Sequence, residues 1–226
     1  MRGVLAEVML GMGALDRVLA QMLPYVPRSI VSRFSARYIA GAHLQDALDA
    51  VQRLNDGGIR ATVDVLGEFV LELSEVERAT AHYVDLLDAL HAHELDSQAS
   101  VKLTQLGLKL DPQVCLGNVR VLVRRAEEQG NLVTLDMEDS SCTDATLDIF
   151  ETLRRESTSV GAVLQACLRR SRADLERLLP LEPNVRICKG IYIEPPEIAY
   201  PRRHEVRESF LELVDALLAR PSFVGI

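Results

Sequence analysis

The chain has 226 residues, 48% of them hydrophobic, and its 33 acidic and 25 basic residues give a formal net charge of −8. This length is enough for one sizeable core but short for two ordinary domains and a linker. An acidic chain without a basic run does not fit a nucleic-acid-binding protein, and no window approaches the ~20 apolar residues of a membrane helix. We therefore expect one globular βα domain without a nucleic-acid partner.

The ends of the chain and its cysteines bear on where the protein works. The first 13 residues are apolar with one early arginine, as in a signal peptide, but Glu7 interrupts them. We expect an amphipathic helix there. The cysteines form no C-x-x-C pair, which indicates neither a zinc site nor a disulfide framework and favours a reducing cytoplasm. They are Cys115, Cys142, Cys167 and Cys188.

The first forty residues predict helices that break at Pro24 and Pro27, because proline removes a backbone donor and clashes with the preceding turn. A further helix then runs up to Gly57-Gly58, which end it. We interpret residues 1–57 as an N-terminal helical extension and residues 58–226 as a partial βα barrel.

Short apolar runs then alternate with helix-like stretches at roughly the spacing of βαβ units. The runs show little polar alternation, which is typical of strands buried on both faces of a parallel sheet. Six strands are expected, at residues 61–64, 99–102, 132–136, 161–165, 184–189 and 223–226. An open doubly wound sheet and a (βα)8 TIM-like barrel with six of its eight strands both fit. The absence of G-x-G-x-x-G after the first strand weakens a dinucleotide-binding Rossmann fold.

Capping residues predict where four helices begin. The predicted starts are a Ser74/Glu77 capping box, the Asp111-Pro112 pair, Thr143 or Asp144, and Ser171. A last helix is expected from about residue 204 to residue 219.

Catalytic groups of a βα barrel lie at the carboxyl ends of the strands. The predicted strand ends carry Asp64, Lys102, Asp136, Gln165 and Lys189. Lys102 could bind a substrate carboxylate or pair with Asp136. The acidic residues could bind a metal, act as acid or base, or pair with lysines, although no histidine accompanies them.

Three further residues could contact a flavin, although ordinary contacts within the protein could also account for them. The amide of Gln165 could read a flavin pyrimidine edge or bond nearby backbone. Arg186 inside a strand needs an anion, which could be a reduced flavin, Asp136 or Asp64. Gly190 after Lys189 offers a close backbone approach to a pyrophosphate.

Five motifs in order resemble the proline dehydrogenases. Residues 186–192, Arg-Ile-Cys-Lys-Gly-Ile-Tyr, followed by Glu194-Pro195, are similar to the family's R-x-V-K-G-A-Y segment. The others are residues 64–68 (similar to D-x-L-G-E), 100–104 (S-V-K-L-T, similar to the family's S-V-K-L-S), 135–139 (L-D-M-E-D) and 163–166 (V-L-Q-A). The resemblance runs from about residue 33 onward and is closest to the small bacterial monofunctional enzymes.

The resemblance implies a fold and an activity. The fold is a distorted (βα)8 barrel, and the reaction oxidises L-proline to Δ1-pyrroline-5-carboxylate by hydride transfer to FAD. A quinone or another membrane acceptor then takes the electrons, which implies a cytoplasmic protein with peripheral contact to the inner membrane. Two alternatives stay open: another flavin-dependent barrel oxidoreductase, similar to methylenetetrahydrofolate reductase, or an inactive product that binds no flavin.

The resemblance also implies which residues hold FAD. Arg186 would stabilise charge beside the reducing flavin, and Gln165 would read its pyrimidine edge. Lys189 and Gly190 would hold the cofactor, and Asp136 would help to shape the pocket for flavin and substrate.

On the substrate side, Lys102 would attract the proline carboxylate. Tyr192 would line the pocket, and Ile191, where the family has alanine, could crowd it. Asp64 and Glu68 would pair with cations. In the family a T-H-[DN] motif, two more strands and a helix with paired arginines follow the sixth strand. We therefore expect a C-terminally truncated enzyme whose 226 residues do not suffice for turnover.

Overall fold

The computed structural model of the chain describes residues 39–67, 70–219 and 224–225. The chain divides into two compact units, residues 1–50 and 51–226. The described part of the first unit holds the start of α4 (Leu44–Asp56), where the His43 N–H donates to the Asp46 carboxylate at 2.9 Å. The helices predicted before residue 39, and Glu68, lie outside the described residues.

The second unit is built on a six-stranded parallel sheet whose spatial order follows the order along the chain. The strands are β1 (Ala61–Asp64), β2 (Ser97–Val101), β3 (Val133–Leu135), β4 (Val160–Gln165), β5 (Asn184–Cys188) and β6 (Val224–Gly225). All six predicted strands are therefore confirmed, with small shifts at their ends.

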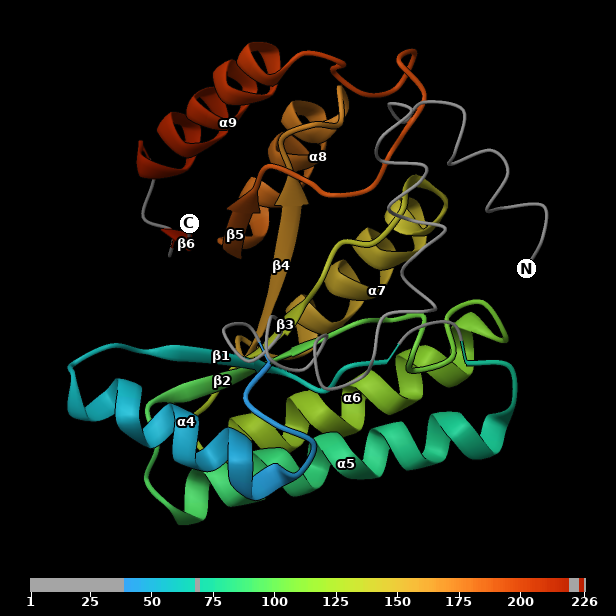
Figure 1. Cartoon of the computed structure of the whole chain (residues 1–226). Helices are drawn as coiled ribbons and strands as arrows, with labels where there is room; N and C mark the ends of the chain where they lie inside the picture. The colour runs from blue at the N-terminus through green and yellow to red at the C-terminus, as the bar shows by residue number, and fades with distance from the viewer. Residues whose placement is uncertain (1–38, 68–69, 220–223, 226) are drawn as a thin grey trace, which may run out of the picture. The chain divides into compact units, whose positions relative to one another are not determined.

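The strand order decides between the two predicted architectures. A doubly wound sheet reverses its strand order at a switch point, whereas a consecutive order winds in one direction around a barrel. Figure 1 shows the strands turning from nearly horizontal β1 and β2 to nearly vertical β4, as in a curved barrel wall. Within the described residues β1 and β6 each pair with a single strand, so the barrel is incomplete.

Helices connect successive strands. They are α5 (Leu73–Ala92), α6 (Pro112–Glu128), α7 (Thr143–Glu156), α8 (Ser171–Leu178) and α9 (Arg203–Leu218), with 3-10 turns η2 (Ser140–Cys142) and η3 (Leu179–Leu181). Helix α6 packs against both α5 and α7, and the three helices cover β2, β3 and β4 (Figure 1).

The middle strands are buried on both faces. Every residue of β3 and β4 is buried. Leu87 of α5, Leu122 of α6 and Leu147 of α7 are also fully buried. The barrel interior and the helix layer thus leave no solvated face on these strands, which explains their unbroken apolar sequence.

The predicted capping box at Ser74 is wrong. Helix α5 begins at Leu73, and its N-cap is Glu72, which makes no side-chain cap bond. Ser74 therefore lies inside the first turn and cannot cap it. The Glu75 carboxylate instead accepts a hydrogen bond from the Leu71 N–H at 3.0 Å.

The predicted cap at Thr143 or Asp144 is also wrong. Asp139 accepts a hydrogen bond from the Ser141 N–H at 2.9 Å and starts η2, which runs directly into α7. The cap therefore lies one short turn earlier than the sequence pattern indicates. The Asp111 cap of α6 is confirmed, since its carboxylate accepts from the Gln113 N–H at 2.8 Å.

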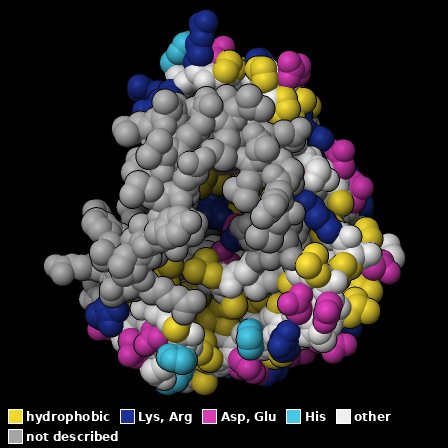
Figure 2. Space-filling view, turned by 45° about the vertical axis from the view of Figure 1, so that its right-hand side comes forward, with side chains coloured by type: hydrophobic (Ala, Val, Ile, Leu, Met, Phe, Trp, Pro, Cys, Tyr) yellow, Lys and Arg dark blue, Asp and Glu magenta, His cyan; other side chains and the backbone are white. Residues whose placement is uncertain are grey.

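On the face shown in Figure 2, acidic, basic and hydrophobic side chains of the described residues are interspersed. Such mixing differs from the single-sign patch by which proteins attract polyanions. Among the described helices, none combines the length and the apolar character needed to cross a membrane.

Candidate active site

The strand register brings the predicted site residues together. Val101 of β2 is paired with Leu135 of β3, so the residues that follow, Lys102 and Asp136, leave the sheet side by side. Asp64 ends β1 at the same edge. Because all strands are parallel, their carboxyl ends form one rim.

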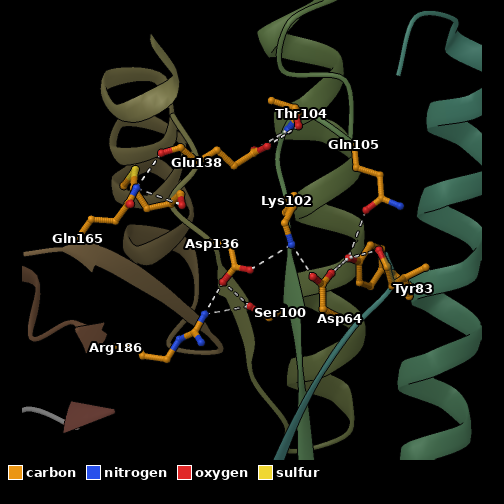
Figure 3. Close-up of polar contacts among 12 residues, drawn as sticks. Asp64, Tyr83, Ser100, Lys102, Thr104, Gln105, Asp136, Glu138, Gln165 and Arg186 are labelled. Atoms are coloured by element: carbon orange, nitrogen blue, oxygen red, sulfur yellow. Dashed lines mark hydrogen bonds and ion pairs between the residues drawn. The ribbon is translucent and has the colours of Figure 1, made fainter. Parts of the chain in front are cut away.

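Five side chains at this rim form a polar network, which we call the rim cluster: Asp64, Ser100, Lys102, Asp136 and Arg186 (Figure 3). The Lys102 ammonium pairs with Asp64 and lies 3.6 Å from Asp136 Oδ2. Arg186 Nη2 donates to Asp136 Oδ1, and the Ser100 hydroxyl donates to the same oxygen at 2.6 Å. Asp136 thus bridges the two cations, and it is the anion that faces Arg186.

The rim cluster is partly shielded from water. The side chains of Lys102 and Asp136 are 16% and 18% exposed, while that of Arg186 is 37% exposed. Two cations and two carboxylates balance formally, and shielding strengthens their attraction. An incoming carboxylate must therefore share Lys102 or Arg186 with Asp64 or Asp136. A zwitterion can pair its carboxylate with one of the cations and its ammonium group with one of the carboxylates.

Tyr83 of α5 supports Asp64 from the core side. This tyrosine is 0% exposed, and its hydroxyl donates to Asp64 Oδ1 at 2.9 Å. The hydroxyl also lies 3.3 Å from the Val65 carbonyl and 3.4 Å from Gln105 Oε1. Burial, followed by the charge of Asp64, raises the pKa of Tyr83 far above its ordinary value, so the hydroxyl stays protonated.

Glu138 joins three strand ends. Its side chain is 0% exposed, and its carboxylate accepts from the Thr104 N–H at 2.9 Å and from the Thr104 hydroxyl. Its backbone carbonyl accepts from Gln165 Nε2 at 2.7 Å, and the Met137 carbonyl lies 3.3 Å from the same nitrogen. The amide nitrogen of Gln165 is thus directed at backbone, one of the two roles that the sequence left open.

The segment between β5 and α9 carries the remaining predicted residues. Lys189 is exposed, Ile191 is 87% exposed and Tyr192 is half-buried. The Glu194 carboxylate accepts from the N–H and the hydroxyl of Ser140, both at 2.7 Å, and so fastens this segment to the loop after β3.

Two atomic features at β5 bear on ligand binding. Arg186 Nε is buried and has no hydrogen-bond partner within the described chain. Gly190 has a φ of +96°, and a Cβ there would collide with the sulfur of Cys167 and lie 2.9 Å from Gln165 Oε1. Only glycine lets the backbone adopt this conformation and approach so closely.

The structure thus links four predicted residues by ion pairs, namely Asp64, Lys102, Asp136 and Arg186. Gln165 does not join these pairs but bonds to the backbone of Glu138. Lys189 and Ile191 face solvent. Sequence reasoning missed the polar roles of four residues: Tyr83, Ser100, Thr104 and Glu194. For Tyr83 a signal existed, since a tyrosine within an apolar helix face needs a partner for its hydroxyl. Among the described residues, no three histidine, cysteine or acidic side chains are grouped to hold a metal ion.

A sequence profile of the proline dehydrogenase family matches residues 47–199. The chain belongs to the proline dehydrogenase family. It is 33% identical over 190 residues to proline dehydrogenase 1 of Bacillus subtilis subsp. natto, and 37% identical over 195 residues to the proline dehydrogenase of Deinococcus radiodurans. Both alignments cover 84% of this chain and 63% of the relative, so the chain spans less than two thirds of these proteins.

Solved structures of proline utilization A have the same fold. The protein from Bdellovibrio bacteriovorus superposes with a TM-score of 0.79 at 23% identity, over 87% of this chain and 25% of that one. The protein from Corynebacterium freiburgense gives a TM-score of 0.75 at 23% identity, over 93% and 25%. The predicted family and the incomplete βα barrel are therefore both confirmed.

Proposed function

We propose that this member of the proline dehydrogenase family catalyses the first step of proline catabolism, the oxidation of L-proline to Δ1-pyrroline-5-carboxylate with FAD as hydride acceptor. The observation that carries this proposal is the meeting of Lys102 and Asp136, which directly follow the carboxyl ends of β2 and β3, with Arg186 in the middle of β5. This is the end at which βα barrels place their chemistry.

Two features of the described residues suit FAD. The buried Arg186 Nε is a donor that finds no acceptor among the described residues, and buried donors are seldom left unpaired. The backbone at Gly190 packs closely against the side chains of Cys167 and Gln165, which places this segment beside the glutamine that we assign to the flavin. We assign FAD binding to Arg186, Lys189 and Gly190, with Gln165 and Asp136 beside them.

Each residue has a distinct task in the proposed reaction. FAD, when bound, supplies the two-electron acceptor that side chains cannot provide. The Lys102 ammonium binds the proline carboxylate as a point charge. Asp136 holds the Arg186 guanidinium in place. The positive charge of the guanidinium would stabilise the negative charge that a flavin gains when it is reduced. Tyr192 and Ile191 border the substrate side.

We further propose that a quinone or another membrane acceptor takes the electrons, through peripheral contact of a cytoplasmic protein with the inner membrane. Two segments that follow strand carboxyl ends carry exposed aliphatic side chains, which support an apolar acceptor on this side. They are Leu66 and Leu71 after β1, and Ile191 and Ile193 after β5.

The test is to incubate the purified chain with FAD and to follow flavin absorbance while L-proline is added anaerobically. We expect FAD to bind to the chain. We expect L-proline to reduce the bound flavin slowly, seen as a loss of its absorbance, and NADH to leave it oxidised. Reduction by NADH alone would instead indicate a methylenetetrahydrofolate reductase-like enzyme. A preparation that stays colourless after FAD is added would contradict flavin binding.

Steady-state turnover with a dye acceptor is measured beside the Deinococcus radiodurans protein. Because the sequence predicts that these 226 residues do not suffice for turnover, we expect a rate far below that of the relative. Equal rates would overturn that prediction and leave the assignment of the reaction intact.

A further inference from the structure

A buried tyrosine lies behind the rim cluster, out of reach of a substrate. Tyr83 is fully buried on α5, and its hydroxyl donates to Asp64 Oδ1 at 2.9 Å. The other carboxylate oxygen, Oδ2, pairs with the Lys102 ammonium. Asp64 is therefore held at one oxygen by the helix layer and presents the other oxygen to the lysine (Figure 3).

We infer that Tyr83 is a positioning residue for substrate binding, which orients Asp64 so that Asp64 holds the Lys102 ammonium where the proline carboxylate arrives. This inference rests on the proposed function and adds a residue that touches neither substrate nor cofactor.

The need for such a positioning residue follows from the geometry of Lys102. A lysine side chain is long and flexible, and its ammonium has a second carboxylate within reach, since Asp136 Oδ2 lies 3.6 Å away. Asp136 is also the partner of Arg186. If Asp64 turned away, Lys102 would shift toward Asp136 and compete with Arg186 for it.

The surroundings of the hydroxyl make Tyr83 suitable as a fixed donor. Besides Asp64, the Val65 carbonyl and Gln105 Oε1 lie within 3.4 Å, so acceptors from the segments after β1 and β2 meet at one hydroxyl. Because burial keeps the pKa of Tyr83 far above its ordinary value, the hydroxyl donates throughout the working pH range.

The inference predicts an effect on one side of the site only. Tyr83 contacts Asp64 at the end of β1 and Gln105 after β2, whereas the proposed FAD ligands Arg186 and Lys189 belong to β5 and the segment after it. Loss of the hydroxyl should therefore weaken proline binding and leave FAD affinity unchanged.

The test compares Tyr83→Phe with Tyr200→Phe. The first variant removes one oxygen from a ring that keeps its packing. The second makes the same change at a half-buried tyrosine whose ring lies 4.7 Å from the Arg169 guanidinium, outside the rim cluster. We expect Tyr83→Phe to raise the KM for L-proline roughly 5- to 10-fold, with kcat and the FAD dissociation constant changed less than about twofold. Tyr200→Phe should change none of these quantities.

A second readout does not need turnover. The rate at which acetic anhydride acetylates Lys102 is measured by mass spectrometry relative to Lys189 in the same molecule. We expect Tyr83→Phe and Asp64→Asn to speed this modification several-fold, with no further gain in the double variant, because both loosen the same contact.

The outcomes separate the two proposals. If the wild-type chain binds no FAD and oxidises no proline, the proposed function fails, and the acetylation rates alone decide whether Tyr83 positions Lys102. If the wild type oxidises proline and Tyr83→Phe leaves KM unchanged, the positioning role is wrong while the function stands. A parallel fall in kcat, FAD affinity and folded fraction would show a purely structural role and also overturn the inference.

Discussion

The two sides of the candidate site are built differently. On the β1–β3 side, Asp64, Lys102 and Asp136 leave neighbouring strands, and the pairing of the sheet fixes their separation. On the β5 side, Lys189 and Gly190 lie in an irregular, exposed segment, which is fastened to the loop after β3 through Glu194. The proposed substrate side is thus set by the sheet itself, whereas the proposed cofactor side depends on a few loop contacts.

Replacing Arg186 should have the largest effect, because this residue belongs to both sides. Arg186→Ala removes the partner of Asp136 and the buried Nε donor. We expect the rate of flavin reduction by proline to fall on the order of 100-fold or more, and FAD to bind at least about 10-fold more weakly. Arg172→Ala removes an exposed arginine paired with Glu176 and serves as the control. Stopped-flow reduction and FAD titration give the two numbers, and equal values for both variants would contradict the role of Arg186.

Glu138 tests whether the β1–β3 side depends on buried hydrogen bonds. Glu138→Ala leaves the N–H and the hydroxyl of Thr104 without their acceptor in a buried site. We expect the free energy of unfolding, measured by urea denaturation, to fall by about 2–4 kcal/mol. Glu156→Ala, which breaks an exposed pair with Arg120, should cost much less. Similar losses for the two variants would mean that the buried contacts of Glu138 add no particular stability.

Replacing Lys102 tests whether proline and FAD bind to different sides of the site. Lys102→Met keeps the length of the side chain but removes its charge, so the KM for L-proline should rise roughly 10- to 100-fold. FAD affinity should stay within about twofold, because Arg186, Lys189 and Gly190, to which FAD binding is assigned, lie on β5 and in the segment after it. Lys109→Met, at a lysine that pairs with Asp139 at 3.1 Å, is the control. A loss of FAD affinity in Lys102→Met that matches the loss of proline affinity would remove the distinction between the sides.

Gly190 tests the β5 side through its backbone, with Gly130 as a matched position. Both glycines have positive φ, +96° and +64°, but only at Gly190 does an added Cβ meet neighbouring atoms within 4 Å. We expect Gly190→Ala to weaken FAD binding roughly 10-fold. Gly130→Ala should reduce stability by about 1 kcal/mol without affecting FAD. Equal FAD affinities in the two variants would indicate that the segment after β5 does not hold the cofactor.

The sequence predicted the parts of this structure that depend on local pattern. Apolar runs gave all six strands, and the alternation of strands with helices correctly placed Asp64, Lys102 and Asp136 at one rim. The family resemblance was likewise carried by short motifs at strand ends.

The sequence did not predict features that depend on distances between strands. Both carboxylates were possible partners for each cation, and only the register pairs Asp64 with Lys102 and places Asp136 between Lys102 and Arg186. The N-cap of α5 was missed by two residues because a capping pattern does not specify which turn comes first. The partner of Tyr83 was not predicted, since nothing near this tyrosine in the chain marks Asp64, 19 residues away.

The central claim is that the Arg186 end of the rim cluster faces the flavin, and a crystal structure of this chain with FAD tests it most directly. We expect the isoalloxazine ring within hydrogen-bond distance of the Arg186 guanidinium, with the Nε proton paired to the ligand and Asp136 still bound to Nη2. FAD bound elsewhere on the barrel, or an Arg186 whose Nε has turned to a protein acceptor, would contradict it.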